Sequence, residues 1–179
     1  LVVLLVWLVV QFLIGLTPFY KDTMSLPPRM MLLIMPAILM MGGLFVTKKG
    51  KQFINTLDIS LLTYIHTVRI PVECVLFFLF LNNKIPQLMT FEGRNFDIII
   101  GITAPLIGYF GIHKKLLTKP FLVGWNVVGI LFLLWIVFHG ILSVPTPFQQ
   151  FGFDQPNIAM MYAPFVWLPS FIVPVVLFS

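Results

Sequence analysis

Three residues that could bind a ligand or move a proton lie in the middle of one long apolar segment. The segment runs from residue 57 to residue 81 and contains His66, Arg69 and Glu73. Spacings of three and four residues place these side chains on one stripe of a helix. Arginine offers a fork of donors, glutamate accepts, and histidine exchanges a proton near neutral pH. The stripe predicts a buried site in which Arg69 holds an anionic or polar group, Glu73 balances or relays charge, and His66 tunes protonation.

A structural ion pair is the alternative for the same stripe. One charge at the centre of a bilayer costs roughly 2.5–3.5 kcal/mol, so Arg69 and Glu73 each need a partner. We expect these two to interact directly or through water, with His66 one turn away. Pro71 lies between them and cannot donate to the carbonyl of Thr67, which predicts a kink beside the pair.

Six further polar residues are candidates at the outer face of the membrane: Glu92, Arg94, Asp97, Gln149, Gln150 and Asp154. Two carboxylates that flank Arg94 could bind a cation or act as acid and base. Asp97 lies near the start of an apolar segment, where helix capping also explains it. The glutamines could line an outward cavity. The spacing of Glu92, Arg94 and Asp97 matches no catalytic signature, so the sequence leaves open whether the protein is an enzyme.

Metal and cofactor sites have little support in the sequence. The single cysteine, Cys74, lies in an apolar segment, and no paired cysteine and histidine spacing is present. Three histidines, His66, His113 and His139, fall at different expected depths, which disfavours haem held between two of them. No metal site is predicted, and the cofactor is unknown.

The composition is that of a protein whose solvent is lipid. Hydrophobic residues make up 59% of the 179 residues and charged residues only 9%, against about 25% charged in a soluble domain. Nucleic acid is not an expected partner, because the net charge of +5 reflects clustered lysines between apolar segments. The expected partners are the lipid bilayer and a membrane protein or a second copy of the chain.

Continuous apolar runs predict an all-α, polytopic transmembrane bundle in a single domain over residues 1–179. The chain begins inside an apolar run without an initiator methionine, so we expect a longer natural protein, with a seventh span as an open alternative. The six predicted spans are about 1–19, 28–47, 57–81, 96–112, 120–142 and 158–178.

The loops between these runs predict the topology. Those at 48–56 and 113–119 hold six lysines, whereas 20–27, 82–95 and 143–157 together hold three basic and three acidic residues. The positive-inside rule therefore places the two lysine loops in the cytoplasm. The two longer outward loops are rich in aromatic residues and proline, and we expect them to fold back as ordered re-entrant or interfacial structure. Their phenylalanines are expected to pack over the helix ends: Phe91, Phe96, Phe148, Phe151 and Phe153.

Three strings resemble those of a group of uncharacterised bacterial polytopic membrane proteins. They are HTVRIPVE at 66–73, MTFEGRNFD at 89–97 and PTPFQQFGFDQPN at 145–157. The resemblance covers roughly the last two-thirds of the chain. It implies a multi-pass protein of the bacterial inner membrane and no particular activity.

The function predicted from the sequence is binding or passing a small ligand or proton through the His66, Arg69 and Glu73 site, which opens to the outer face. One alternative is a non-catalytic subunit of a larger membrane complex, with the charges facing a partner helix. Another is a membrane-embedded enzyme that acts on a lipid-like substrate, with Glu73 or Glu92 as acid or base.

Overall fold

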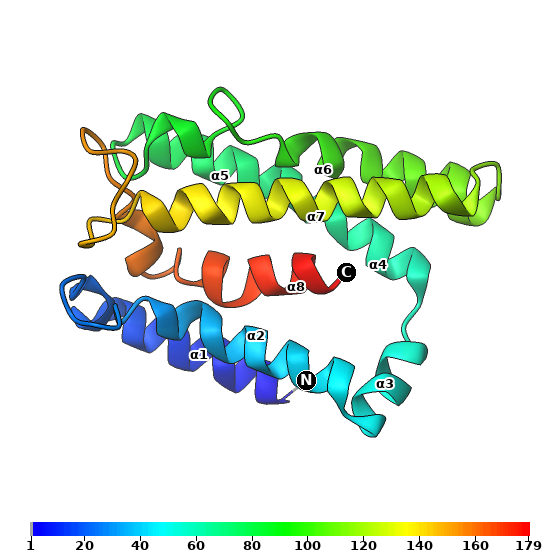
Figure 1. Ribbon diagram of the computed structural model, residues 1–179, viewed down its shortest axis with the longest axis horizontal. Helices are drawn as coiled ribbons and strands as arrows, with labels where there is room; N and C mark the ends of the chain where they lie inside the picture. The colour runs from blue at the N-terminus through cyan, green and yellow to red at the C-terminus, as the bar shows by residue number, and fades with distance from the viewer. Residues whose placement is uncertain (1) are drawn as a thin grey trace.

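Helices form all the regular structure that the computed structural model of the protein describes, which covers residues 2–179 (Figure 1). The first two long helices are α1 (Val2–Leu16) and α2 (Met31–Val46), and a 3-10 turn at Phe19–Lys21 lies between them. The short helix α3 (Lys48–Asn55) follows α2 after a bend of 89°.

The predicted polar stripe lies on a helical segment that changes its winding at its middle. Helix α4 (Ile59–Ile65) passes through a 3-10 turn at His66–Val68 into α5 (Arg69–Leu81). The tighter turn lies next to Pro71, which has no N–H to donate to the preceding turn. The expected irregularity beside Arg69 is therefore present as a local tightening of the helix.

The second half of the chain supplies the remaining helices. Helix α6 (Asp97–Leu106) continues into wider π-helical turns at Ile107–His113, after Pro105. Helix α7 (Lys119–Leu142) is the longest continuous α-helix. A 3-10 turn at Gln87–Met89 precedes α6, and another at Ala159–Met161 follows α7. The described chain finishes in π-helical turns at Leu168–Ile172 and in α8 (Val173–Phe178).

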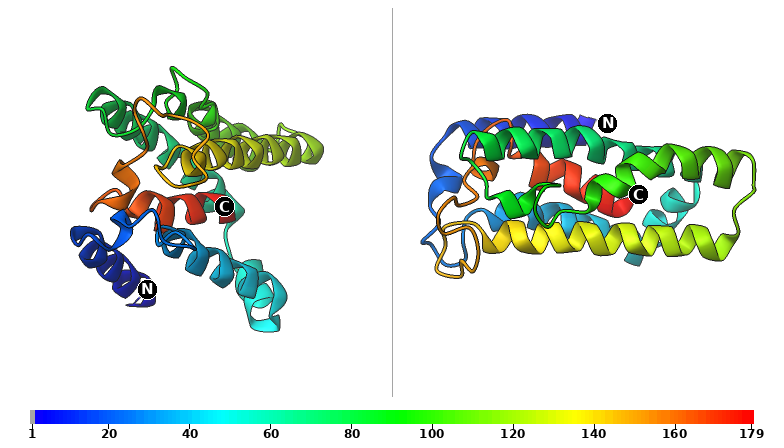
Figure 2. Two further views of the ribbon diagram at one scale, coloured as in Figure 1. Left: turned by 60° about the vertical axis from the view of Figure 1, so that its left-hand side comes forward. Right: turned by 90° about the horizontal axis from the view of Figure 1, so that it is seen from above.

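The C-terminal helix lies inside the bundle. Helices α5, α6 and α7 form one group, α1 and α2 form a second group, and α8 lies between the two groups (Figures 1 and 2). The indole of Trp7 on α1 donates to the carbonyl of Ser170 at 3.0 Å. In return, the indole of Trp167 donates to the carbonyl of Leu8 at 2.9 Å. These bonds and the surrounding apolar contacts join the two groups through the last segment of the chain.

Helix lengths differ from the six-span prediction. Each of the six predicted segments contains helix, but among residues 2–179 only two helices are long and apolar enough to cross a membrane: Ile59–Leu81 and Lys119–Leu142. The bent pair of α2 and α3 would make a third. The helices Val2–Leu16, Asp97–His113 and Leu168–Phe178 are shorter. By length and composition, the structure therefore supports two or three spans in the place of six.

The last predicted segment is the one that departs most from its expected form. It was predicted to span 158–178, but the helix that can be counted as apolar begins only at Leu168. Pro164, Pro169 and Pro174 follow one another at intervals of five residues, and each removes a backbone donor. Residues 162–166 consequently form turns in place of a continuous helix.

Connecting segments gather at the two ends of the bundle. The lysine loop after α6 and the lysine-rich helix α3 lie at one end, and the segments 17–30, 82–96 and 143–158 lie toward the other (Figure 1). The loop 82–96 also returns along the bundle, so that α6 begins close to the start of α5, where Asp97 meets Arg69 (Figures 1 and 2). This return brings the first residues of α6 to the level of the polar stripe.

Candidate functional site

A buried ion pair joins α5 to α6. The guanidinium of Arg69 donates through Nη1 to the carboxylate of Asp97, and the two residues are 2% and 5% exposed. The same nitrogen also donates to the carbonyl oxygen of Gly129 on α7 at 3.1 Å. Arg69 therefore links three helices, and its positive charge is matched by Asp97.

Glu73 lies one turn further along α5 and has a neutral partner. Its carboxylate accepts from the side-chain amide of Asn95, which also donates to the carbonyl of Met89 at 3.1 Å. The oxygen of that amide accepts from the backbone N–H of Asp97 at 3.0 Å. Asn95 therefore fixes both the end of the returning loop and one oxygen of Glu73. The other oxygen, Oε2, is buried without a hydrogen-bond partner.

The prediction that Arg69 and Glu73 interact directly or through water finds no direct contact among residues 2–179, because the ion-pair partner of Arg69 is Asp97. The sequence placed Asp97 at the outer mouth of a helix, whereas the returning loop carries it to the middle of the bundle. Asn95 was missed as a site residue for the same reason. The available signal was the length of the segment between residues 82 and 96, which exceeds what a simple turn between adjacent helices needs.

His66 is buried near the pair but has a different set of neighbours. Its ring lies edge-on to Trp125, with 5.3 Å between the ring centroids, and Nε2 is 3.4 Å from the hydroxyl of Ser179. Its Nδ1 atom has no hydrogen-bond partner. The predicted stripe of three residues is thus buried as expected, but it makes three separate sets of contacts.

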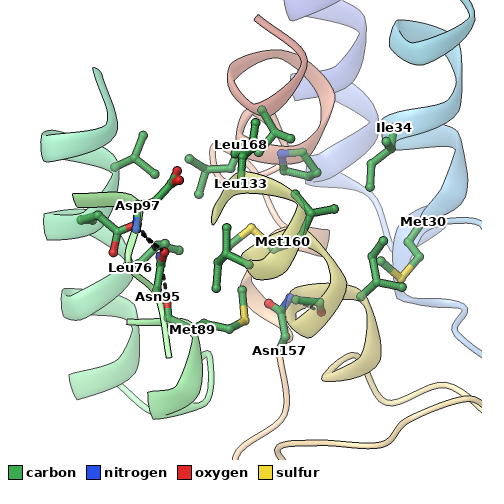
Figure 3. A pocket seen from close by; sticks show the side chains of 18 residues that line it. Met30, Ile34, Leu76, Met89, Asn95, Asp97, Leu133, Asn157, Met160 and Leu168 are labelled. Carbon is green, nitrogen blue, oxygen red and sulfur yellow. Dashed lines mark hydrogen bonds between the residues drawn. The ribbon is translucent and has the colours of Figure 1, made fainter. Parts of the chain in front are cut away.

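A cavity of about 100 Å³ adjoins the carboxylates (Figure 3). Glu73, Asn95 and Asp97 lie along one side of it, and Asn157 lies near the loop end. The amide of Asn157 donates to the carbonyl of Gly140 at 3.0 Å, whereas its oxygen Oδ1 has no partner. Apolar side chains complete the lining, among them Met30, Ile34, Leu76, Leu133, Met160 and Leu168. The cavity therefore combines apolar walls with two unpartnered acceptors.

The other outer-face candidates do not join this site. Glu92, Arg94, Gln150 and Asp154 are exposed on the loops. The side chain of Gln149 donates within its own loop, to the carbonyls of Phe151 at 3.0 Å and Gly152 at 3.3 Å. Of the six candidates, only Asp97 belongs to the buried cluster.

Both outward loops contact the helices, and the packing of their phenylalanines makes only part of these contacts. Phe148 and Phe153 are 56% and 70% exposed, and Phe91 and Phe96 are exposed as well. Polar contacts also anchor the loops. The amide of Gln155 donates to the carbonyl of Ile85 at 2.6 Å, and the indole of Trp135 donates to the carbonyl of Arg94 at 3.1 Å. Three of the phenylalanine rings also pack on rings of the helices. Phe151 stacks on His139 with centroids 5.0 Å apart, Phe91 packs on Phe77 at 5.0 Å, and Phe96 packs on Phe132 at 5.7 Å.

Metal ligands do not cluster in the part of the chain that the structure describes. Residues 2–179 contain no group of three or more histidine, cysteine, aspartate or glutamate side chains that could hold a metal ion. The side chains of the buried cluster can hydrogen-bond, compensate charge and exchange protons through their carboxyl groups.

Comparison with known proteins gives a family but no activity. No curated protein and no solved structure matches the chain. A family model described as a domain of unknown function (DUF8737) matches residues 26–179. The match includes the ion pair, the returning loop and every residue that lines the cavity. The chain therefore belongs to the DUF8737 family of domains of unknown function.

Proposed function

We propose that this protein is a multi-pass protein of the bacterial inner membrane that binds a small ligand, with Glu73 as the group that receives a proton or a positive charge. Placement in a membrane is supported by the large apolar side chains exposed along the helices, such as Leu39, Phe78 and Leu131. Soluble monomers rarely expose an apolar surface of this extent to water. The three shorter helices fit the same environment if the bilayer thins around them or if flanking residues extend their spans.

The charge of the site favours a proton or a cationic group over an anion. Arg69 and Asp97 offset each other, so Glu73 is the remaining acidic group of the buried cluster. A carboxylate in an apolar interior is costly unless it is paired and hydrogen-bonded. Glu73 is 1% exposed and receives one hydrogen bond, on one oxygen. It is therefore suited to hold a proton until a ligand with a positive or donor group replaces that proton.

The walls of the cavity favour a ligand with a small apolar body. Its volume of about 100 Å³ is below that of the ~150 Å³ apolar cavity that accommodates benzene in an engineered protein. Met89 and Asn157 line the cavity and belong to the loops at one end of the bundle, which is the outer face in the predicted topology. We therefore propose entry from the outer side.

One observation carries the proposal: the unpartnered oxygen of buried Glu73 beside an apolar cavity. The alternative of a subunit in a larger complex requires the charges to face a helix of a partner protein. Arg69, Glu73 and Asp97 are instead buried within this single chain. The enzyme alternative needs two free titratable groups, and Asp97 is held by Arg69.

A carbodiimide that partitions into membranes tests the site, because it reacts with protonated carboxyl groups in apolar surroundings. We expect dicyclohexylcarbodiimide to modify Glu73 in the reconstituted protein, as measured by peptide mass spectrometry. Glu73→Gln should abolish this modification, and Glu92→Gln, which removes an exposed carboxyl group, should leave it unchanged. Butylamine should slow the loss of the unmodified Glu73 peptide, a readout that also counts any amide that the amine forms with the activated carboxyl group, whereas butyrate, of similar size and opposite charge, should not. Modification of Glu73 that butylamine does not slow would exclude the cationic ligand and leave only the proton.

A further inference from the structure

A second apolar space lies between α1, α2 and the C-terminal segment, away from the Glu73 cavity. Its volume is about 320 Å³, and it shares no lining residue with that cavity. No charged side chain lines it, and Ser170 is its one hydroxyl-bearing residue. The residues that line it include Val3, Trp7, Met40, Leu44, Phe53 and Phe178. An elongated apolar group fits these walls better than a polar ligand does.

Helix α3 borders this groove and is oriented differently from the spanning helices. It leaves α2 at 89°, so it runs across the end of the bundle, as an amphipathic helix lies at a membrane surface. Phe53 of α3 lines the groove, whereas Lys48, Lys49 and Lys51 are exposed. The helix thus brings an apolar groove and three ammonium groups within about two helical turns of one another.

The three lysines lack an internal counter-charge. Helix α3 contains no acidic residue, and the ion pairs found within residues 2–179 involve Arg29 and Arg69 but none of the lysines. They also occupy the start of the helix, where the helix dipole is already positive. The hydroxyl of Thr47 accepts the backbone N–H of Gly50 at 3.1 Å, and it offers no negative charge. An anion at this position would offset both the ammonium charges and the dipole.

We infer that this corner binds a phospholipid with an anionic headgroup. One acyl chain lies in the groove, and the phosphate lies against Lys48, Lys49 and Lys51. The lipid is held by two features at once: the groove takes an acyl chain of any phospholipid, and the lysines select the anionic headgroup. The inference depends on the membrane setting proposed above but not on the role of Glu73.

Native mass spectrometry of the full chain in detergent, with phosphatidylglycerol and phosphatidylcholine of identical acyl chains, tests this site. We expect the wild-type protein to retain phosphatidylglycerol at least tenfold more strongly. Changing Lys48, Lys49 and Lys51 to glutamine should abolish this preference, and changing them to arginine should preserve it. The matched control changes Lys114, Lys115 and Lys119 to glutamine, because these lysines lie at the same end of the bundle and do not border the groove.

Two further variants separate the site from general basic attraction and from the Glu73 cavity. Met40→Trp fills the groove from an exposed position and should weaken the retention of both lipids. Glu73→Gln should change neither. Equal loss of phosphatidylglycerol in the two lysine-to-glutamine variants would overturn the inference, because it would show attraction to the whole basic end. Unchanged retention in Met40→Trp would overturn it as well, because the chain would then lie outside the groove.

Discussion

At the scale of single residues, the buried ion pair determines which substitutions at Arg69 and Asp97 destabilise the protein. Arg69 and Asp97 are both almost fully buried, and each is the only group of opposite charge that the other contacts in an ion pair within residues 2–179. Removal of one partner leaves an uncompensated charge, whereas replacement of both leaves none. The pair should therefore respond very differently to single and double substitution.

We predict that Asp97→Asn and Arg69→Met each lower the free energy of unfolding by about 3–5 kcal/mol, because a lone buried charge remains. The double variant should recover most of that loss. Thermal unfolding of the purified protein, followed by circular dichroism, measures it. The control combines Arg69→Met with Glu73→Gln and should show no such recovery. Recovery in the control to the same extent would restore the pairing of Arg69 with Glu73.

The sequence predicted part of this site and missed the rest for a definable reason. Helical spacing identified Arg69 and Glu73 as buried neighbours on one helix. It could not identify Asp97 and Asn95, because they come from another element whose depth depends on the path of the loop. Periodicity reports which residues share a face, but it does not report where the next helix begins along the bundle.

At the scale of elements, the returning loop sets the depth of the site. Its final turn passes Gly93 close to the backbone of Gln87 and Leu88, and a Cβ atom at Gly93 would overlap the carbonyl oxygen of Gln87. Thr90 is fully buried, and the backbone N–H of Arg94 donates to the carbonyl of Leu88 at 3.1 Å. The loop therefore has little freedom to move without carrying Asn95 and Asp97 with it.

Gly93→Ala should displace the end of this loop and destabilise the protein by about 1–3 kcal/mol, the usual range for an overfilled site. It should also slow the carbodiimide modification of Glu73 or abolish its protection by butylamine, since Asn95 would move. Gly124→Ala on α7 is the matched control, because a Cβ atom there meets nothing within 4 Å. An unfolding temperature unchanged in both variants would show that the close approach at Gly93 is not required.

Sequence reasoning anticipated only part of what holds the outward loops against the helices. The predicted aromatic packing is present at Phe91, Phe96 and Phe151, whereas Phe148 and Phe153 are exposed, and amide and indole groups make further contacts. A hydrogen bond from Gln155 to a carbonyl of a distant segment has no periodic signature. In a membrane interface, exposed phenylalanines face headgroups and acyl chains, so the cost that water would impose on them does not apply.

At the scale of the whole molecule, the alternation of basic loops predicts the orientation in the proposed membrane setting. Lys49 on α3 and Gln150 on the loop after α7 lie at opposite ends of the bundle (Figure 1). The order and approximate limits of the helices follow from apolar runs in the sequence. The shorter lengths of some helices cannot be predicted in this way, because apolar residues near prolines or in folded-back loops do not extend a helix. Residues 158–167 are an example.

Cysteine accessibility in intact cells measures the orientation. In a background with Cys74→Ala, we expect a cysteine at position 150 to react with a membrane-impermeant maleimide from outside. A cysteine at position 49 should react only after the cells are opened. The two positions serve as controls for one another. Reaction of both from the same side would rule out the proposed topology.

The position of α8 also has a consequence for biosynthesis. The segment that joins the two helix groups follows the other described helices along the chain, so it is synthesised after them, and Gly15 on α1 receives the backbone N–H of Ala163 only once that segment exists. Until then, the inner surfaces of α1, α2 and α7 lack their contacts with it. The earlier helices therefore emerge from the ribosome as two groups without their common centre, and final assembly must follow translation of residue 178. A nascent chain arrested before Leu168 should then remain open and sensitive to protease, however well its earlier helices have inserted.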